Sequence, residues 1–268
     1  MTLLTLEGQG ILEVPVVYGC NFACNYCAHL SPLMKVSPVP VEQIEQQFKD
    51  WQPRLAPRVV RIMGGEPLLH PGIEQIVEVF ATWWCDGSCL TTISICTNGS
   101  MLDRMPPSFF ELLAKHRVTL KVTLHHPNLR YRITSFLESI KTPLLIVDAA
   151  KDNDFKKYYD IIDGKPQLYQ GESQASHSVC YVKRACFTLS DNRLYHCSIL
   201  AYFRKAYELG IIDDKRILNY TPGTPDMMDT ELKKWYYGDF SKVCEVCPDK
   251  NHPVLLSEKW NDRRLANA

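Results

Sequence analysis

The chain has 268 residues, of which 46% are hydrophobic, and its 30 basic residues balance 30 acidic ones. A neutral chain lacks the basic excess expected of a dedicated nucleic-acid or membrane-surface binder. The N-terminus shows no signal peptide, and no stretch reaches the about 18 apolar residues of a membrane span. We therefore expect a cytoplasmic protein without nucleic-acid or membrane partners. Its eleven cysteines then predict thiolate chemistry or metal binding rather than disulfides.

The N-terminal half predicts alternating strands and helices. Apolar runs predict strands at 11–18, 58–63, 90–96, 118–124 and 143–147, and helical spacing predicts helices at 41–51, 72–84, 108–115 and 129–140. A polar, partly helical stretch is expected from 148 to about 164. This rhythm is typical of βαβ units on a parallel sheet. Five or six units are too few for a closed eight-stranded barrel, so we expect an α/β fold with a partial barrel of the (β/α)6 type.

The pattern changes near residue 165. Residues 180–197 alternate like a hairpin with its turn at Asp191 and Asn192, and residues 229–237 look helical. We expect two domains, a core over 1–165 and a small hairpin-plus-helix domain over 166–268. Five cysteines in two groups predict a metal site in the second domain, either zinc or iron–sulfur: Cys180, Cys186, Cys197, Cys244 and Cys247.

Three cysteines follow the first predicted strand directly: Cys20, Cys24 and Cys27. Iron–sulfur clusters are normally held by four cysteine thiolates. Three local thiolates therefore indicate a distant fourth ligand, or a cluster with one iron left open for a substrate or cofactor. A structural zinc site completed by His29 is the alternative that these residues leave open.

Polar or glycine residues also end the next predicted strands, where α/β proteins bind ligands. Gly64 and Gly65 precede Glu66, and paired glycines let the backbone approach a ligand. Taken alone, the pair is better explained by a tight turn. The following strand ends in Thr97 and Asn98.

Taken together, these motifs resemble the radical S-adenosylmethionine (radical SAM) superfamily. The resemblance rests on the cysteine spacing of four and three with Tyr26 before the third cysteine, on the Gly-Gly-Glu-Pro segment at 64–67, and on Thr-Asn-Gly at 97–99. The C-terminal cysteines resemble the shortened auxiliary-cluster (twitch, or SPASM-like) domain of some members. The implied cofactors are a [4Fe–4S] cluster, S-adenosylmethionine and one auxiliary [4Fe–4S] cluster.

The resemblance implies a role for each matching residue. The three N-terminal cysteines would bind three irons and S-adenosylmethionine the fourth, which makes His29 a bystander. Cleavage of the cofactor would give a 5′-deoxyadenosyl radical that removes a hydrogen atom from the substrate. Gly64, Gly65 and Glu66 would contact the methionine amine of the cofactor, and Tyr26 would lie beside the adenine. The implied ribose or substrate contacts are Thr97, Asn98, Thr123 and His125.

The auxiliary ligands are matched by spacing to a short aminocyclitol dehydrogenase of this family. The expected set is Cys180, Cys197, Cys244 and Cys247, with Cys186 as the alternative ligand. For the remaining cysteines we expect ordinary small side chains, either buried or partly exposed: Cys85, Cys89 and Cys96.

The expected function is an oxidoreductase that dehydrogenates a sugar, aminocyclitol or nucleotide sugar, with the auxiliary cluster as electron acceptor and a flavodoxin or ferredoxin as donor. The alternatives are a peptide maturase, a glycyl-radical activase and a zinc-stabilised binding protein. Peptide maturation is disfavoured because the first strand starts near residue 11, which leaves no room for a recognition domain. Substrate contacts are sought among polar residues that could equally be surface groups: His125, His126, Arg130, Asp148 and Arg184.

Overall fold

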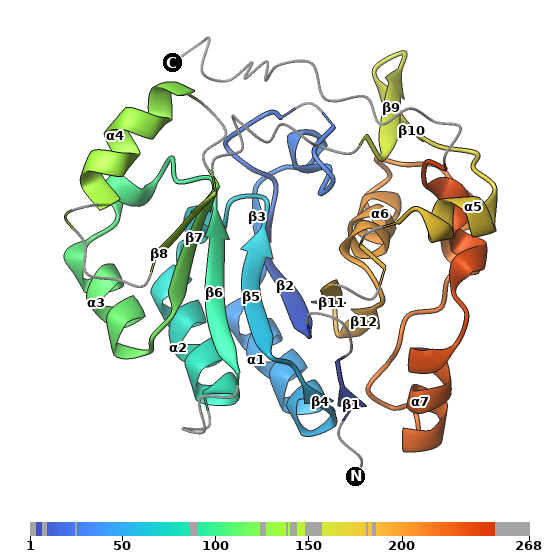
Figure 1. The fold of residues 1–268 in the computed structure, drawn as a ribbon, viewed down its shortest axis with the longest axis horizontal. Helices are drawn as coiled ribbons and strands as arrows, with labels where there is room; N and C mark the ends of the chain where they lie inside the picture. The colour runs from blue at the N-terminus through green and yellow to red at the C-terminus, as the bar shows by residue number, and fades with distance from the viewer. Residues whose placement is uncertain are drawn as a thin grey trace.

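A single mixed sheet forms the centre of the protein (Figure 1). The computed structural model describes residues 4–6, 10–24, 26–85, 91–123, 127–137, 139, 144–147, 157–180, 182–183 and 186–249, without the side chains of 127–131 and 144–147. In spatial order the strands are β12 (Arg193–Tyr195), β11 (Cys186–Ser190), β2 (Ile11–Tyr18), β5 (Val59–Gly64), β6 (Thr92–Thr97), β7 (Thr119–Thr123) and β8 (Leu144–Val147), with β3 (Ser37–Pro38) against β2.

Six of these strands are parallel, from β11 to β8, and β12 and β3 are antiparallel to their neighbours. In the described part of the chain the sheet ends at β12 and β8 and does not close. The expected α/β fold with a partial barrel is confirmed. Its sixth parallel strand is β11, which lies beside β2 and not beyond β8.

Helices cover the outer side of the sheet and its β12 end. They are α1 (Val41–Trp51), α2 (Ile73–Trp84), α3 (Pro107–Lys115), α4 (Pro127–Leu137), α5 (Ser173–Ser178), α6 (Ser198–Glu208) and α7 (Asp229–Tyr237). The last three gather at the β12 end, away from α3 and α4 (Figure 1). Helical spacing places Phe48 of α1 on a buried face, where its ring meets Phe80 of α2 edge-on at 4.7 Å. No helix in the described residues is long and apolar enough to cross a membrane.

Pro15 lies within β2, although proline cannot donate a hydrogen bond to a neighbouring strand. The pairing of β2 with β5 shifts register between Pro15 and Val17. Such an irregularity is where a sheet accommodates a proline. The predicted strand at 11–18 is therefore confirmed, with a local break in its hydrogen bonding.

The C-terminal hairpin joins the same sheet as the N-terminal strands. Strand β11 pairs in parallel with β2, and its turn to β12 uses left-handed Asp191 and Asn192 at φ values of 50° and 58°. The hairpin is confirmed, and the sheet runs across the expected boundary at residue 165.

One local prediction is wrong in the part that the structure describes. The stretch before residue 164 forms a second hairpin, β9 (Tyr159–Ile162) with β10 (Lys165–Leu168). Its turn residues, Asp163 and Gly164, have φ values of 50° and 75°. Asp-Gly favours a turn with two left-handed residues, which matches the twist of a hairpin. A short pair, β1 (Leu4–Thr5) with β4 (Leu55–Ala56), completes the strands.

Candidate functional site

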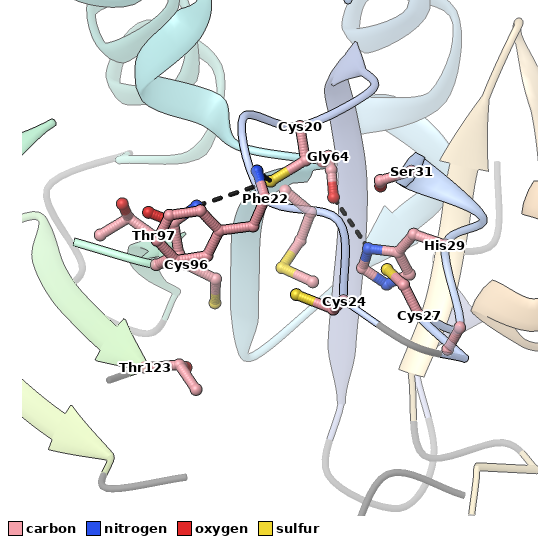
Figure 2. Close-up of a pocket in the computed structure, with 14 residues that line it drawn as sticks. Cys20, Phe22, Cys24, Cys27, His29, Ser31, Gly64, Cys96, Thr97 and Thr123 are labelled. Carbon is pink, nitrogen blue, oxygen red and sulfur yellow. Dashed lines mark hydrogen bonds between the residues drawn. The ribbon is translucent and has the colours of Figure 1, made fainter. Parts of the chain in front are cut away.

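A cavity of about 240 Å³ lies at the carboxyl ends of β2, β5, β6 and β7 (Figure 2). Its lining contains most of the residues that the motifs single out, together with residues that sequence reasoning did not connect to it: Cys20, Phe22, Cys24, Cys27, Ala28, His29, Ser31, Met63, Gly64, Gly65, Cys96, Thr97, Asn98 and Thr123. Figure 2 shows Thr123 on the side of the cavity away from His29. Four separate strand ends therefore contribute to one site.

The three cysteines come from the loop that leaves β2. Cys20 is buried, and its Sγ lies 3.3 Å from the Phe22 amide nitrogen, while Cys24 and Cys27 are half-buried. The loop passes through a left-handed residue at Tyr26, with φ of 55°. Burial raises the pKa of the Cys20 thiol to about 12. A positive charge nearby, such as a bound metal centre, would lower this pKa and favour the thiolate.

The cysteine loop is not arranged as a closed single-ion site. Within the described residues, no three His, Cys, Asp or Glu side chains form a group that could hold one metal ion. All three cysteines instead face a cavity large enough for a group of many atoms. The donor set and the space together fit an iron–sulfur cluster with a small-molecule ligand.

Gly64 and Gly65 allow the end of β5 to cross close to the end of β2. A Cβ atom on Gly65 would overlap the carbonyl oxygen of Gly19, and one on Gly64 would overlap that of Val17. The Gly65 amide donates to Val17 O at 3.0 Å. The glycines are thus needed for backbone packing, and the same packing brings their backbone to the cavity wall.

Glu66 does not line the cavity. Its side chain is fully buried and accepts hydrogen bonds from Thr97 Oγ1 at 2.7 Å, from the Asn98 amide at 2.7 Å and from the Leu68 amide at 3.0 Å. Burial raises the pKa of Glu66 to about 7, although the three donors oppose this shift. The carboxyl group ties the end of β5 to the end of β6 and so holds two walls of the site in place.

We expect Glu66→Ala to lower the free energy of unfolding by about 3 kcal/mol, because several buried donors lose their shared acceptor. Glu66→Gln should cost less, since its amide oxygen can still accept a hydrogen bond. Urea unfolding followed by circular dichroism measures both changes. The matched control is Glu111→Ala on the exposed side of α3. Equal midpoints for the Glu66→Ala and Glu111→Ala variants would contradict this role.

His29 supports the cavity from the other side. Its Nδ1 lies 2.8 Å from the carbonyl oxygen of Gly64, and its ring stacks on Tyr202 of α6 at 4.1 Å. A carbonyl oxygen only accepts, so Nδ1 carries the hydrogen and donates. Burial lowers the pKa of His29. The residue connects the cysteine loop to the Gly-Gly segment, a role that sequence reasoning did not give it.

The other predicted residues are placed as follows. Tyr26 does not line the cavity, and its ring instead meets Tyr159 at 6.1 Å and lies 4.6 Å from Lys157 Nζ. Arg130 belongs to α4, but its side chain is not among those described. Four candidates lie outside the described residues: His125, His126, Asp148 and Arg184.

A second group of cysteines lines a separate small cavity. Four thiols surround about 20 Å³ together with residues that include Tyr158 and Phe240: Cys180, Cys197, Cys244 and Cys247. This volume holds about one water molecule. Burial, and after it the Cys180 thiol, raise the pKa of Cys244 to about 12.

The remaining cysteines lie elsewhere. Cys186 is on β11 and does not line the second cavity. Cys85 is exposed at the end of α2, and Cys96 is partly buried in the wall of the first cavity. Cys89 lies outside the described residues.

Residues 14–170, more than half of the chain, match the radical SAM superfamily. The chain belongs to this family and is a radical SAM enzyme, which uses a [4Fe–4S] cluster and S-adenosylmethionine as cofactors. The match spans the cysteine loop, the glycine–glutamate segment and the carboxyl ends of the four strands at the first cavity.

The sequence relatives include two enzymes named GTP 3′,8-cyclase. That of Microcystis aeruginosa is 32% identical over 104 residues, 37% of this chain and 30% of the relative. That of Aquifex aeolicus is 26% identical over 150 residues, 54% of this chain and 45% of the relative. The chain thus spans less than half of the length of either relative.

Solved structures share the fold over a larger part of the chain. The structure of BtrN in complex with AdoMet and 2-DOIA covers 95% of this chain and 98% of its own, with a TM-score of 0.53 and 14% identity. A structure of anSMEcpe with bound AdoMet and a peptide covers 88% of this chain and 82% of its own, with a TM-score of 0.51 and 16% identity. At these identities the likeness shows the fold alone.

Proposed function

We propose that this chain is a radical SAM oxidoreductase that dehydrogenates a small polar metabolite. When bound, the cluster and S-adenosylmethionine supply a radical that removes one hydrogen atom from the substrate. On this proposal, Cys20, Cys24 and Cys27 hold the cluster in the 240 Å³ cavity. Gly64 and Gly65 then present backbone groups to the cofactor's methionine moiety.

The remaining cavity wall would orient the cofactor and the substrate. Thr97, Asn98 and Thr123 line it, and are the proposed contacts to the cofactor or the substrate. The loop around Tyr26 would flank the adenine. Glu66 would act through the strand ends that it ties together, since its carboxyl group is buried away from the cavity.

The observation that carries the oxidoreductase proposal is the second cysteine cavity. Dehydrogenation removes two electrons and two protons, and loss of one hydrogen atom leaves an electron and a proton still to be removed. The electron needs an acceptor. A second cluster held by Cys180, Cys197, Cys244 and Cys247 is the proposed acceptor, because these four thiols already face one cavity. Residues 166–268 would form the domain around it, and a flavodoxin or ferredoxin would supply the first electron.

Ring closure on a nucleoside triphosphate is the second candidate. The observation in its favour is the sequence similarity to a relative named GTP 3′,8-cyclase, 32% identical over 104 residues. The two candidates differ in their substrates and in whether the substrate is oxidised overall.

The test is metal analysis followed by turnover. Anaerobically purified protein should hold about eight irons with matching sulfide, two [4Fe–4S] clusters in all. Zinc without sulfide would refute the radical assignment. Incubation with S-adenosylmethionine, a reductant and either aminocyclitols, nucleotide sugars or GTP is then followed by mass spectrometry. A product two mass units lighter than its substrate supports dehydrogenation, and an isomer formed from GTP supports ring closure instead.

A further inference from the structure

The sheet has one apolar face and one polar face. Val60 and Ile62 of β5 are fully buried on the outer face, beneath the helices. The intervening residues, Arg61 and Met63, are half-buried on the other face. We call the face that carries Arg61 and Met63 the inner face. Met63, Cys96 and Thr123 on this face line the first cavity. Parallel sheets are usually buried and apolar on both faces, so a polar inner face needs an explanation.

A row of polar residues crosses the inner face, one step below the cavity. The strand register places five residues side by side on five neighbouring strands: Thr188, Glu13, Arg61, Ser94 and Thr119. Arg61 precedes Met63 by two residues, which is about 6.6 Å along a parallel strand. The polar row therefore lies directly beneath the cavity that would hold the cofactor.

Two hydroxyl groups in this row lack partners. Ser94 Oγ and Thr188 Oγ1 are buried, and neither has a hydrogen-bond partner among the described residues. Buried polar groups are nearly always hydrogen-bonded, to protein, water or ligand. Both hydroxyls lie on the inner face, so a polar molecule bound there would satisfy them.

The described side chains of the inner face include two cations, Arg61 and Lys121, and one carboxylate, Glu13. Arg61 pairs with Glu13 at 3.4 Å, whereas no acidic side chain in the described part of the chain pairs with Lys121. Lys121 is half-buried on β7, opposite Cys96 on β6 and two residues before Thr123. Cys96 is on β6, between the strands that carry Arg61 and Lys121. Burial is the main reason that the pKa of its thiol rises to about 11; Arg61 and Lys121 lower this pKa, and Glu13 and Glu66 raise it.

We propose that the inner face binds the substrate, and that the substrate carries a phosphate group held by Arg61 and Lys121 near Cys96 and Ser94. A guanidinium group pairs with oxyanions in two-point geometry, and an ammonium group adds a compact charge. The unpartnered hydroxyls of Ser94 and Thr188 bind polar groups of the same molecule. This inference rests on the proposed radical SAM function and narrows its substrate to a phosphorylated metabolite, such as a nucleotide or nucleotide sugar.

The test measures anion binding by isothermal titration calorimetry. Iron-loaded protein, saturated with S-adenosylmethionine under anaerobic conditions, is titrated with pyrophosphate and, separately, with malonate as a carboxylate probe. We expect pyrophosphate to bind more tightly than malonate. Lys121→Met should weaken it by about tenfold or more, the effect of one lost charge-assisted hydrogen bond, and Lys121→Arg should restore it. The control, Lys49→Met on the exposed surface of α1, should bind as the wild type does.

The following results would overturn the inference of a phosphate site. No pyrophosphate binding by the wild type, or unchanged binding by Lys121→Met, would exclude a phosphate site at Lys121. Tighter binding of malonate would exclude phosphate as the recognised group. The formation of 5′-deoxyadenosine is measured on the same samples. A wild type that forms it but binds no pyrophosphate refutes this inference alone, whereas a wild type that forms none refutes the proposed function.

Discussion

Replacing Cys24 with alanine is expected to reduce the formation of 5′-deoxyadenosine to the level of a protein-free control. Cys24 is half-buried on the loop that follows β2, and its thiol faces the first cavity. A cluster that leaves one iron open for S-adenosylmethionine has only three protein ligands. Without Cys24, two of these three ligands remain. The product is measured by chromatography after incubation with S-adenosylmethionine and dithionite.

Of the three cysteines, Cys24 gives the clearest test of the cluster-ligand assignment. Cys20 is buried, and its Sγ lies close to Phe22 N and Asn98 Nδ2, so replacing it also disturbs local packing. Cys24 is less buried than Cys20, and its variant should keep the wild-type circular dichroism spectrum. The matched control is Cys85→Ala, whose thiol is exposed at the end of α2. A Cys24→Ala protein that still formed 5′-deoxyadenosine would refute the ligand assignment.

The sequence predicted which residues meet at the first cavity, because the determinants of this arrangement are local. Three cysteines lie on one loop, and the glycines and Thr97 end neighbouring strands, so the parallel topology alone brings them together. The contributions of His29 and Glu66 were not predictable in this way. Each depends on a contact across the sheet, His29 with Gly64 and Glu66 with Thr97.

Two further features were present in the sequence but were not interpreted. Asp163 and Gly164 form a two-residue hairpin turn, which an Asp-Gly pair favours, whereas the polar composition of this stretch led to the prediction of partly helical structure. The strands around Arg61 and Lys121 alternate apolar and polar residues, which for a parallel strand indicates a polar inner face. By contrast, the pairing of β11 with β2 joins segments more than 170 residues apart, and no local pattern specifies that choice.

Replacing Cys244 with alanine is expected to lower the iron content from about eight to about four per chain while sparing some 5′-deoxyadenosine formation. Cys244 is buried in the wall of the second cavity, away from the residues that line the first. Loss of a second cluster should therefore leave the first cluster in place. Substrate oxidation should stop, because the second electron would have no acceptor. Iron and sulfide assays, together with product analysis, measure the three quantities separately.

Cys186→Ala is the matched control for the iron count, and it also tests which cysteines are ligands. Cys186 is only six residues from Cys180 in sequence, but it lies on β11, and the Glu13 carboxylate acts on its thiol. The Cys186 side chain does not line the cavity that Cys180, Cys197, Cys244 and Cys247 share. We expect the Cys186→Ala protein to keep all of its iron. Loss of iron from Cys186→Ala, with full retention by Cys244→Ala, would mean that a different set of cysteines holds the second cluster.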